Sequence, residues 1–397
     1  MANDARLVDT PARRDDALDA LAPAKVLAVD TEFLWERTYA PQLALVQVAG
    51  VVDGQVVAFA FDPLEIELDP LDELLGEPER LKVFHAGRLD LELLNLGQDE
   101  PLQPVFDTQI AASLLGYGSQ IGYANLVEVL LGRRLDKAEQ FADWTKRPLR
   151  PEQLDYALDD VVPLLEVYAR LAAELLERER LSWLQEEQAG LSDPETYRAK
   201  DRRELYKKVK GKKGLDRRGL ARLRELTLWR EEAAEQRDLR PSFVVKDHIL
   251  ADVARRNPRN QNQLKQVRGL HKNEVSRSGK AILAALERAR KLPDSELPSH
   301  PKRSSRKGVG AVVDLLKAYL RQASEETGVA VETLTTSSEL ERLVRDEKRE
   351  RYADDHPLLR GWRRELVGED LLQILGGKRY LAVEPGEGRL RVEQAGG

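Results

Sequence analysis

The sequence predicts an α/β layer domain followed by a region made only of helices. Up to about residue 180, short apolar runs typical of strands alternate with helical patterns. From about residue 215, amphipathic helical patterns follow one another without a strand between them. The chain has 397 residues, and ordinary domains have ~150, so we expect two or three domains.

Four strands are expected in the first domain. Three apolar runs come in quick succession, and a fourth, LKVFHAG (81–87), follows a helix expected around 63–75. From Asp107 the pattern turns helical, with a long helix from Pro151 to about residue 180. The pattern predicts a mixed sheet flanked by helices. The first three runs are AKVLAVD (24–30), LALVQVAG (43–50) and VVAFAFD (56–62).

Two sets of helices are expected after the α/β domain. The first set comprises 220–236, 247–256 and 281–290, joined by turn-forming stretches at 256–263 and 277–280. Residues 292–308 are rich in Pro, Ser, Lys and Arg and predict a linker. The second set comprises 311–326, 337–348 and 357–375 and faintly echoes the first. The domains expected are therefore 1–200, 210–295 and 309–397.

Composition restricts the chemistry and the location. The chain has no cysteine, and its five histidines never fall at the i, i+4 spacing of a helical zinc site. A metal must then be held mainly by oxygen, which favours Mg²⁺ or Mn²⁺. The sequence has neither the ~18 consecutive apolar residues of a membrane helix nor the apolar part of a secretory signal. We expect a cytoplasmic protein with no membrane partner.

Charge is distributed unevenly along the chain. Residues 1–200 hold 19 Lys/Arg against 38 Asp/Glu, residues 201–310 hold 30 against 14, and residues 311–397 hold 14 against 17. The middle segment is therefore the predicted polyanion-binding part. Its densest run is 207–218, for which a flexible linker is the alternative. The candidate phosphate contacts there are Lys207, Lys208, Lys210, Lys212 and Lys213.

Paired carboxylates close the first predicted strand. Asp30 and Glu32 lie two residues apart, so in a strand they point to the same side. Taken alone, such a pair can be structural. Further along, Asp90 stands at the entry of a helix after the fourth strand, where the helix dipole favours an anion. Tyr156 and Asp160 lie four residues apart, hence on one helix face.

Four carboxylates brought together without cationic partners repel one another. A pair of divalent cations resolves that repulsion. Two such ions ~4 Å apart can activate a water and stabilise a leaving oxygen, which is the geometry for hydrolysing a phosphodiester. Asp159 competes with Asp160, and the spacing from Tyr156 selects Asp160.

Three stretches resemble the exonuclease motifs of the DEDD superfamily, in its tyrosine-bearing subclass: DTEFLWERTYAPQLALVQVA, FHAGRLDLELL and YALDD. The intervening 106–118 and 135–165 resemble the ribonuclease D family in particular. This resemblance covers most of 25–170 and implies a ribonuclease-H-like fold and removal of nucleotides from 3′ to 5′. Residues 215–290 resemble the HRDC domain, a helical module, which suggests that 311–392 is a second, diverged copy.

The resemblance also implies roles at the site. Asp30, Glu32 and Asp160 would hold two divalent metals, with Asp30 shared between them, and Asp90 would support the second metal. Tyr156 would hold and orient the attacking water. A phenol has a reference pKa near ~10, so Tyr156 is better suited to orienting than to acting as a free base.

Contacts to RNA are expected at three further positions. Phe33 is a candidate stacking surface for the terminal base, with a core phenylalanine as the alternative. His85 could reach the substrate, although a structural role is favoured. Lys137 could contact a phosphate, with a solvated lysine as the more common alternative. Gln47 and Asp107 are expected to be structural polar residues.

The sequence therefore predicts a metal-dependent 3′-5′ exoribonuclease that trims structured RNA such as transfer-RNA precursors. It predicts no nucleotide cofactor, because no full phosphate-binding loop pattern occurs. It predicts a monomer, because no coiled coil or exposed apolar seam is apparent in the sequence. Two alternatives remain open, a DNA 3′ exonuclease and a nucleic-acid-binding scaffold that has lost catalysis.

Overall fold

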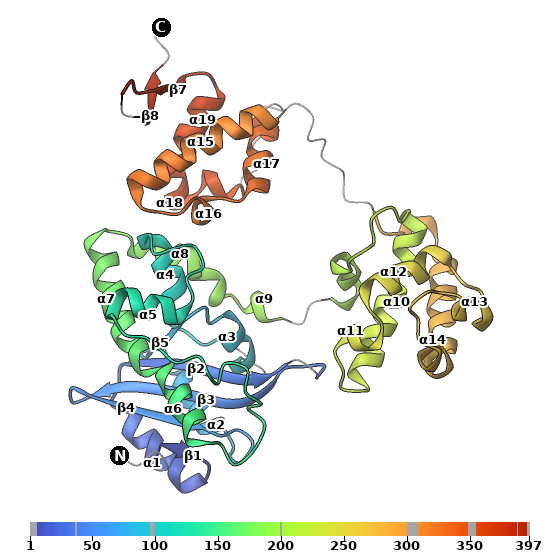
Figure 1. Ribbon diagram of the computed structural model, residues 1–397, viewed down its shortest axis with the longest axis horizontal. Coiled ribbons are helices and arrows are strands. Elements are labelled where there is room, and N and C mark those ends of the chain that lie inside the picture. Colours follow the sequence, from blue (N-terminus) through green and yellow to red (C-terminus); the bar gives the residue numbers. More distant parts are fainter. Residues whose placement is uncertain are drawn as a thin grey trace. The chain divides into compact units, whose positions relative to one another are not determined.

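The computed structural model describes residues 6–35, 38–95, 100–198, 201–299, 309–347, 355–386 and 388–394. The chain divides into two compact units (Figure 1). The first, here the sheet unit, comprises Met1–Glu32, Ala44–Tyr197 and Ser305–Gly397. The second, here the helical unit, comprises Phe33–Leu43 and Arg198–Ser304.

A six-stranded mixed sheet with the order β1-β4-β3-β2-β5-β6 forms the centre of the sheet unit. Strand β3 is antiparallel to β4, whereas β2 with β5 and β5 with β6 are parallel. The predicted mixed sheet is thereby confirmed. The strands are β1 (Leu7–Val8), β2 (Val26–Leu34), β3 (Gln42–Val52), β4 (Gln55–Phe61), β5 (Leu81–Phe84) and β6 (Val105–Asp107).

The sequence patterns did not predict the short elements at the edges of the sheet. Strand β1 has two residues and β6 has three, too few to show an alternation. Helix α1 (Pro11–Leu21) was not predicted either. The expected helix at 63–75 begins too early, since α2 spans Asp69–Gly76. Before it, Asp62 accepts hydrogen bonds that hold residues 64–66 in turns.

Helices pack around the sheet, and the expected long helix after Pro151 is in fact two helices. It ends at Asp159 and a second helix starts at Val162. Pro163 lacks the N–H that an unbroken helix would donate to the carbonyl of Asp159, so the helix breaks there. The helices are α3 (Arg88–Leu94), α4 (Thr108–Leu115), α5 (Tyr123–Leu131), α6 (Pro151–Asp159), α7 (Val162–Glu177), α8 (Leu181–Gln188) and α9 (Pro194–Tyr197).

The C-terminal segment packs against α8 and shares one hydrophobic core with the rest of the sheet unit. Trp183 stacks on Trp362, with ring centroids 4.7 Å apart and an interplanar angle of 13°. Arg363 pairs with both carboxylate oxygens of Glu187. The segment contains α15 (Gly310–Thr327), α16 (Val331–Leu334), α17 (Ser337–Glu347), α18 (Gly361–Arg363), a π-helical turn η6 (Arg364–Gly368), α19 (Glu369–Leu375) and an unpredicted hairpin of β7 (Arg379–Val383) and β8 (Leu390–Gln394).

The helical unit has a hydrophobic core of its own. The expected turn at 277–280 is wrong, because Gly279 lies inside α14 on a buried face with Val275 and Ile282. Burial of that face outweighs the low helix propensity of glycine. The elements are η3 (Arg202–Lys208), α10 (Arg217–Glu235), α11 (Pro241–Val244), α12 (Asp247–Arg256), α13 (Gln261–Lys265), α14 (Lys272–Lys291) and η4 (Asp294–Glu296).

The structure describes only the first part of the expected linker at 292–308. Leu297 is buried against Ala221 and Ala289, so the linker's first residues belong to the helical unit. Residues 300–308 lie outside the described residues. Tyr206 and Val209 are buried in the core of the helical unit, so this unit begins before the expected boundary at residue 210.

Candidate active site

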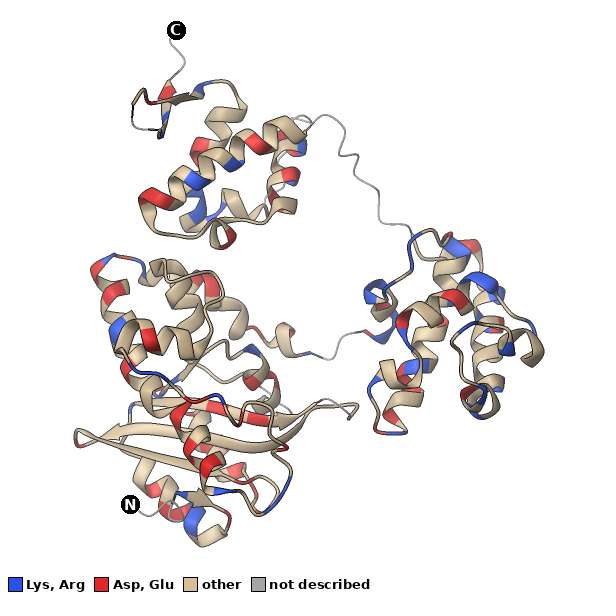
Figure 2. Cartoon of the chain, viewed as in Figure 1, with Lys and Arg blue, Asp and Glu red and all other residues tan. Residues whose placement is uncertain are grey.

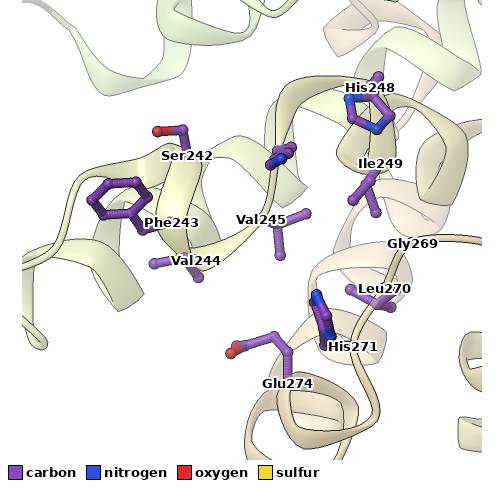
Figure 3. Close-up of a pocket in the computed structure, with 11 residues that line it drawn as sticks. Ser242, Phe243, Val244, Val245, His248, Ile249, Gly269, Leu270, His271 and Glu274 are labelled. Atoms are coloured by element: carbon purple, nitrogen blue, oxygen red, sulfur yellow. The ribbon is translucent and has the colours of Figure 1, made fainter.

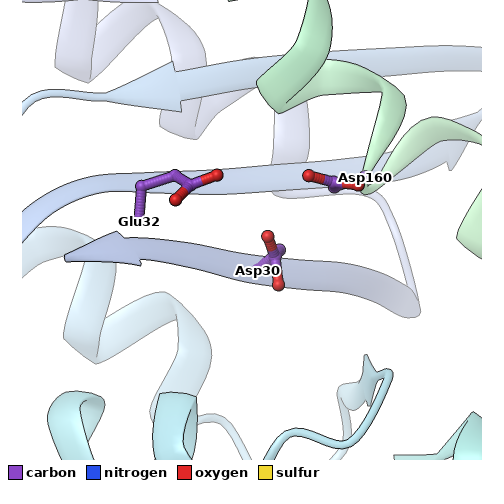
Figure 4. A group of neighbouring side chains, drawn as sticks. All are labelled: Asp30, Glu32 and Asp160. Atoms are coloured by element: carbon purple, nitrogen blue, oxygen red, sulfur yellow. The ribbon is translucent and has the colours of Figure 1, made fainter. Parts of the chain in front are cut away.

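Three carboxylates meet at the C-terminal half of β2. One oxygen each from Asp30, Glu32 and Asp160 lies within 4.8 Å of the other two (Figure 4). Asp30 and Glu32 share one side of β2, as the strand period requires. Asp160 caps the C-terminus of α6, at the break before α7. The structure thus brings together residues that are 130 positions apart in the sequence.

Asp90 is linked to this cluster by a hydrogen bond from Thr31 of β2. It is buried in the first turn of α3, and Thr31 donates a hydrogen bond of 2.5 Å to its Oδ1. Thr31 itself is buried between Asp30 and Glu32 in the strand. The carboxylate of Asp90 also acts electrostatically on both Asp30 and Glu32. The four predicted acids therefore belong to one electrostatic cluster.

The turn that leads into α3 is held by Asp107. This carboxylate accepts hydrogen bonds from the backbone N–H groups of Ala86, at 3.1 Å, and Gly87, at 2.9 Å. It also caps α4. A Cβ at Gly87 would lie 2.3 Å from the Cβ of Phe84, so only glycine fits there. The structural role expected for Asp107 is confirmed, and its effect is to fix the start of the helix that carries Asp90.

The carboxylates are costly to ionise where they lie. Burial raises the pKa of Asp30 well above its usual range, and Asp90, Asp160 and Glu32 add to the shift. Burial, followed by Asp160 and Asp90, raises the pKa of Glu32 to about 8. Burial, followed by Asp159, raises the pKa of Asp160 to about 7. Among the described residues, no lysine or arginine forms an ion pair with these acids, and such a donor set fits a divalent cation.

Tyr156 lies on α6, half-buried beside the cluster. Burial raises its pKa, and Asp160, Glu32 and Asp30 raise it further, so the phenol stays protonated. Its ring centroid lies 6.0 Å from that of Trp144, which is almost fully buried. Tyr156 is thus a neutral hydrogen-bond donor set against a packed aromatic surface.

Tyr123 is a residue of this site that the sequence patterns did not indicate. Its hydroxyl donates a hydrogen bond of 3.3 Å to the carbonyl oxygen of Asp159. That is the carbonyl for which Pro163 has no N–H. Burial raises the pKa of Tyr123, with further contributions from Asp160 and Asp30. Pro163 signals an unpaired carbonyl in the sequence, but nothing there names the donor.

His85 has both ring nitrogens engaged within the protein. Nδ1 lies 3.0 Å from Oγ1 of Thr108, and Nε2 lies 3.0 Å from the carbonyl oxygen of Ile121. Burial lowers its pKa. These contacts join the residue after β5 to the start of α4 and to the loop before α5, which accords with the structural role favoured from the sequence.

The other predicted RNA contacts lie on the surface. Lys137 is exposed in the loop between α5 and α6, in the sheet unit. Phe33 is half-exposed and belongs to the helical unit, where Arg240 lies over the ring of Trp35. Gln47 is fully buried and its amide group has no hydrogen-bond partner among the described residues.

The predicted basic run is part of the helical unit. Val209 and Leu215 anchor it in the core, which does not fit the flexible-linker alternative. Lys207 pairs with Glu204, and Lys212 donates to the backbone. Lys208, Lys210 and Lys213 are exposed. In Figure 2 the blue segments on the ribbon of this unit are its lysines and arginines.

A cavity of about 390 Å³ lies elsewhere in the helical unit (Figure 3). It is lined by apolar side chains, among them Phe243, Val245 and Leu270, and by polar ones, among them His248 and Glu274. None of the site residues predicted from the sequence lines it.

The fold and the acidic cluster define a 3′-5′ exonuclease. Residues 5–176 match the family described as 3′-5′ exonuclease, and residues 219–286 match the HRDC domain. Ribonuclease D of Granulibacter bethesdensis is 40% identical, over 90% of this chain and 89% of its own length. Ribonuclease D of Nitrobacter hamburgensis is 39% identical, over 98% of this chain and all of its own length.

A solved structure shows the same architecture. Escherichia coli RNase D, described as an exoribonuclease involved in structured RNA processing, aligns with a TM-score of 0.81 and 31% identity. The alignment covers 94% of this chain and 98% of that one. The chain belongs to the ribonuclease D family and is a 3′-5′ exoribonuclease, a hydrolase whose class depends on divalent metal. The resemblance to ribonuclease D and the predicted mixed sheet followed by a helical HRDC domain are confirmed. The second, diverged HRDC copy at 311–392 stays a prediction, and this segment is not all-helical, because it ends in the hairpin of β7 and β8. None of the described helices has the length and apolar character needed to span a membrane.

Proposed function

We propose that this enzyme trims the 3′ ends of structured RNA, such as transfer-RNA precursors, with two divalent cations, Mg²⁺ or Mn²⁺. The observation that carries this proposal is the cluster of Asp30, Glu32 and Asp160 within 4.8 Å, without a cationic partner among the described residues. We further propose that the enzyme acts as a monomer in the cytoplasm, as its sequence leads us to expect.

The acids are suited to hold the metals. Asp30 lies under the influence of the other three acids, which supports its assignment as the ligand shared by both ions. Glu32 and Asp160 complete the set, and Asp90, fixed by Thr31, supports the second ion. When bound, two such ions activate a water and stabilise the leaving oxygen of a phosphodiester.

Tyr156 completes the catalytic set. Because its phenol stays protonated, it can donate a hydrogen bond but cannot serve as a base at neutral pH. We assign it the role of holding and orienting the attacking water. Trp144 packs near the ring, with the centroids 6.0 Å apart, and so limits the positions open to the phenol.

Substrate capture depends on the basic part of the chain. Residues 1–200 carry a net charge of −19 (19 − 38) and residues 201–310 carry +16 (30 − 14). The first segment repels a polyanion, so we assign capture of the RNA body to Lys208, Lys210 and Lys213 and their neighbours. Phe33 is retained as a proposed stacking surface for the 3′ base, and His85 as a residue of the site wall.

One assay tests the proposal. The protein is incubated with RNA and DNA carrying recessed or overhanging 3′ ends, in Mg²⁺, Mn²⁺ or EDTA, beside Asp30→Asn and Tyr156→Phe. Asp159→Asn is the matched control, since Asp159 is the exposed neighbour of Asp160. We expect stepwise RNA loss that requires metal, is abolished by Asp30→Asn and persists in Asp159→Asn.

Two other results would reject the proposal. Preferential loss of DNA would support the DNA exonuclease. Binding of RNA without hydrolysis, in every metal, would support the scaffold.

A further inference from the structure

The loop between α5 and α6, residues 132–150, is anchored beside the active site. Trp144 is only 3% exposed and packs near the ring of Tyr156. Arg147 donates to the buried carboxylate of Asp62, at 2.6 Å from its Nη2, and to the carbonyl of Ala44, at 2.8 Å. The loop therefore has a defined position next to a proposed catalytic residue.

Phe141 stands out on this loop because its residue is 90% exposed. The turn that carries it is closed by hydrogen bonds from the N–H of Gln140 to the carbonyl of Lys137 and from the N–H of Ala142 to the carbonyl of Glu139. The carboxylate of Glu139 also pairs with Arg150. An ordered turn thus holds a phenylalanine ring in water, which forgoes the hydrophobic gain of burying it.

Lys137 is on the same turn, four residues before Phe141, and is also exposed. Among the described residues it has no carboxylate partner. Every other cation of the loop has one. Those five are Arg133, Arg134, Lys146, Arg147 and Arg150. The loop therefore presents one unpaired cation and one open aromatic ring.

We propose that Phe141 stacks on a nucleobase of the single-stranded 3′ segment of RNA as it enters the active site, with Lys137 neutralising a neighbouring phosphate. An aromatic face accepts any base, and a free cation matches the backbone charge. A purely apolar partner would leave the charge of Lys137 without a counterpart. This inference rests on the proposed function, and it adds an RNA-binding subsite on the rim of the site.

Equilibrium binding of short single-stranded RNA to the full chain tests this, in an Asp30→Asn background that prevents hydrolysis. We expect Phe141→Ala to weaken binding about tenfold and Phe141→Trp to retain it, since stacking needs a ring. Leu176→Ala is the control. Leu176 is 66% exposed near the far end of α7, roughly 21 Å along the helix from its start beside Asp160, and its truncation should change nothing.

A series of RNAs, each with one abasic position placed successively further from the 3′ end, identifies the base that contacts Phe141. At one position the missing base should weaken binding to the parent protein about tenfold and should not weaken binding to Phe141→Ala any further. That non-additivity is the signature of a direct contact.

Several outcomes would overturn the inference. These are unchanged affinity in Phe141→Ala, equal loss in Phe141→Trp, and a loss that is independent of every abasic position. A change in sedimentation of Phe141→Ala would instead make the ring a contact between copies of the chain. Failure of the parent enzyme to hydrolyse RNA would reject the proposed function alone, because these binding measurements do not require hydrolysis.

Discussion

The hydroxyl of Tyr123 donates to the carbonyl oxygen of Asp159, 36 residues away in sequence. That oxygen precedes Asp160, and it lacks a helical donor because residue 163 is proline. The phenol therefore provides a donor for the carbonyl of the last residue of α6, directly before the proposed metal ligand. We expect Tyr123 to act as a positioning residue for Asp160.

Tyr123→Phe should remove this hydrogen bond and leave the ring contact with His85 in place. We expect a loss of about 1 kcal/mol in the free energy of unfolding and a rise of about fivefold in the Mg²⁺ concentration that gives half-maximal activity. The rise follows because Asp160 is held less firmly. Titration of activity with Mg²⁺ checks it.

Tyr197→Phe is the matched control for that change. Tyr197 donates from its hydroxyl to the backbone carbonyl of Leu191, at 2.6 Å, so it loses the same kind of bond elsewhere. We expect it to lower stability without altering the metal requirement. An equal shift in both variants would contradict the positioning role.

The acidic cluster should make the metal-free protein less stable as pH rises. Glu32 and Asp160 have pKa values of about 8 and about 7 in the folded chain, against ordinary values of 4.5 and 3.8. Between these limits the folded state binds more protons than the unfolded state, so the free energy of unfolding falls with increasing pH. In EDTA, we expect the Tm to fall by roughly 5 °C from pH 5 to pH 8.

Two comparisons isolate that effect. Glu32→Gln removes one of the titrating groups, so its Tm should fall less over the same range. Mg²⁺ should raise the Tm of the parent protein more at pH 8 than at pH 5, because it offsets the charge of the ionised acids. A Tm difference between the parent and Glu32→Gln that is constant with pH would sink this account.

Thr31→Val should alter the pH dependence of the reaction through Asp90. The Thr31 hydroxyl lowers the pKa of Asp90 by donating to it, in opposition to burial, which raises it. Without that donor the pKa of Asp90 rises further, so the acid limb of the pH–rate profile should move to higher pH. At pH 7 we expect activity to fall about tenfold, the effect of losing a hydrogen bond to a charged group.

Thr227→Val provides the comparison for that variant. Thr227 is fully buried in the helical unit and donates to the carbonyl of Leu223. Its substitution should lower stability and leave the pH–rate profile in place. An unmoved profile in Thr31→Val would show that Asp90 does not depend on this bond.

Arg363→Ala should release the C-terminal segment from α8. Arg363 pairs with Glu187 and also donates to the carbonyls of Thr333 and Leu334. Removing one partner of a largely buried pair leaves the other charge uncompensated, so we expect a loss of about 3 kcal/mol in the free energy of unfolding. Calorimetry measures it. Arg364→Ala, an exposed neighbour paired with Glu369 at 3.6 Å, should cost little by comparison.

Local sequence patterns predicted the parts of the site that depend on spacing. Asp30 and Glu32 follow from the strand period, and Tyr156 and Asp160 from the helix period, although the helix ends one residue before Asp160. Long-range partners have no local signal. Thr31 and Asp90 are 59 residues apart and contact each other only because β2 and β5 are adjacent and α3 follows β5. The resemblance to the exonuclease family, more than the local patterns, predicted that the four acids lie together.

The misplaced elements have a similar cause. α14 runs through 277–280 because Val275 and Ile282 bury its face against other helices, a contribution that local propensity does not contain. The turns at 64–66 depend on the carboxylate and the carbonyl of Asp62, and Arg147, 85 residues further along the chain, pairs with that carboxylate.

The stacked pair of Trp183 and Trp362 gives the protein an intrinsic optical reporter. The chain has only five tryptophans, and these two indoles lie nearly parallel at 4.7 Å. Their excited states should couple and produce a paired circular-dichroism band that vanishes when the rings separate. Detachment of the C-terminal segment could then be followed in real time without any added label.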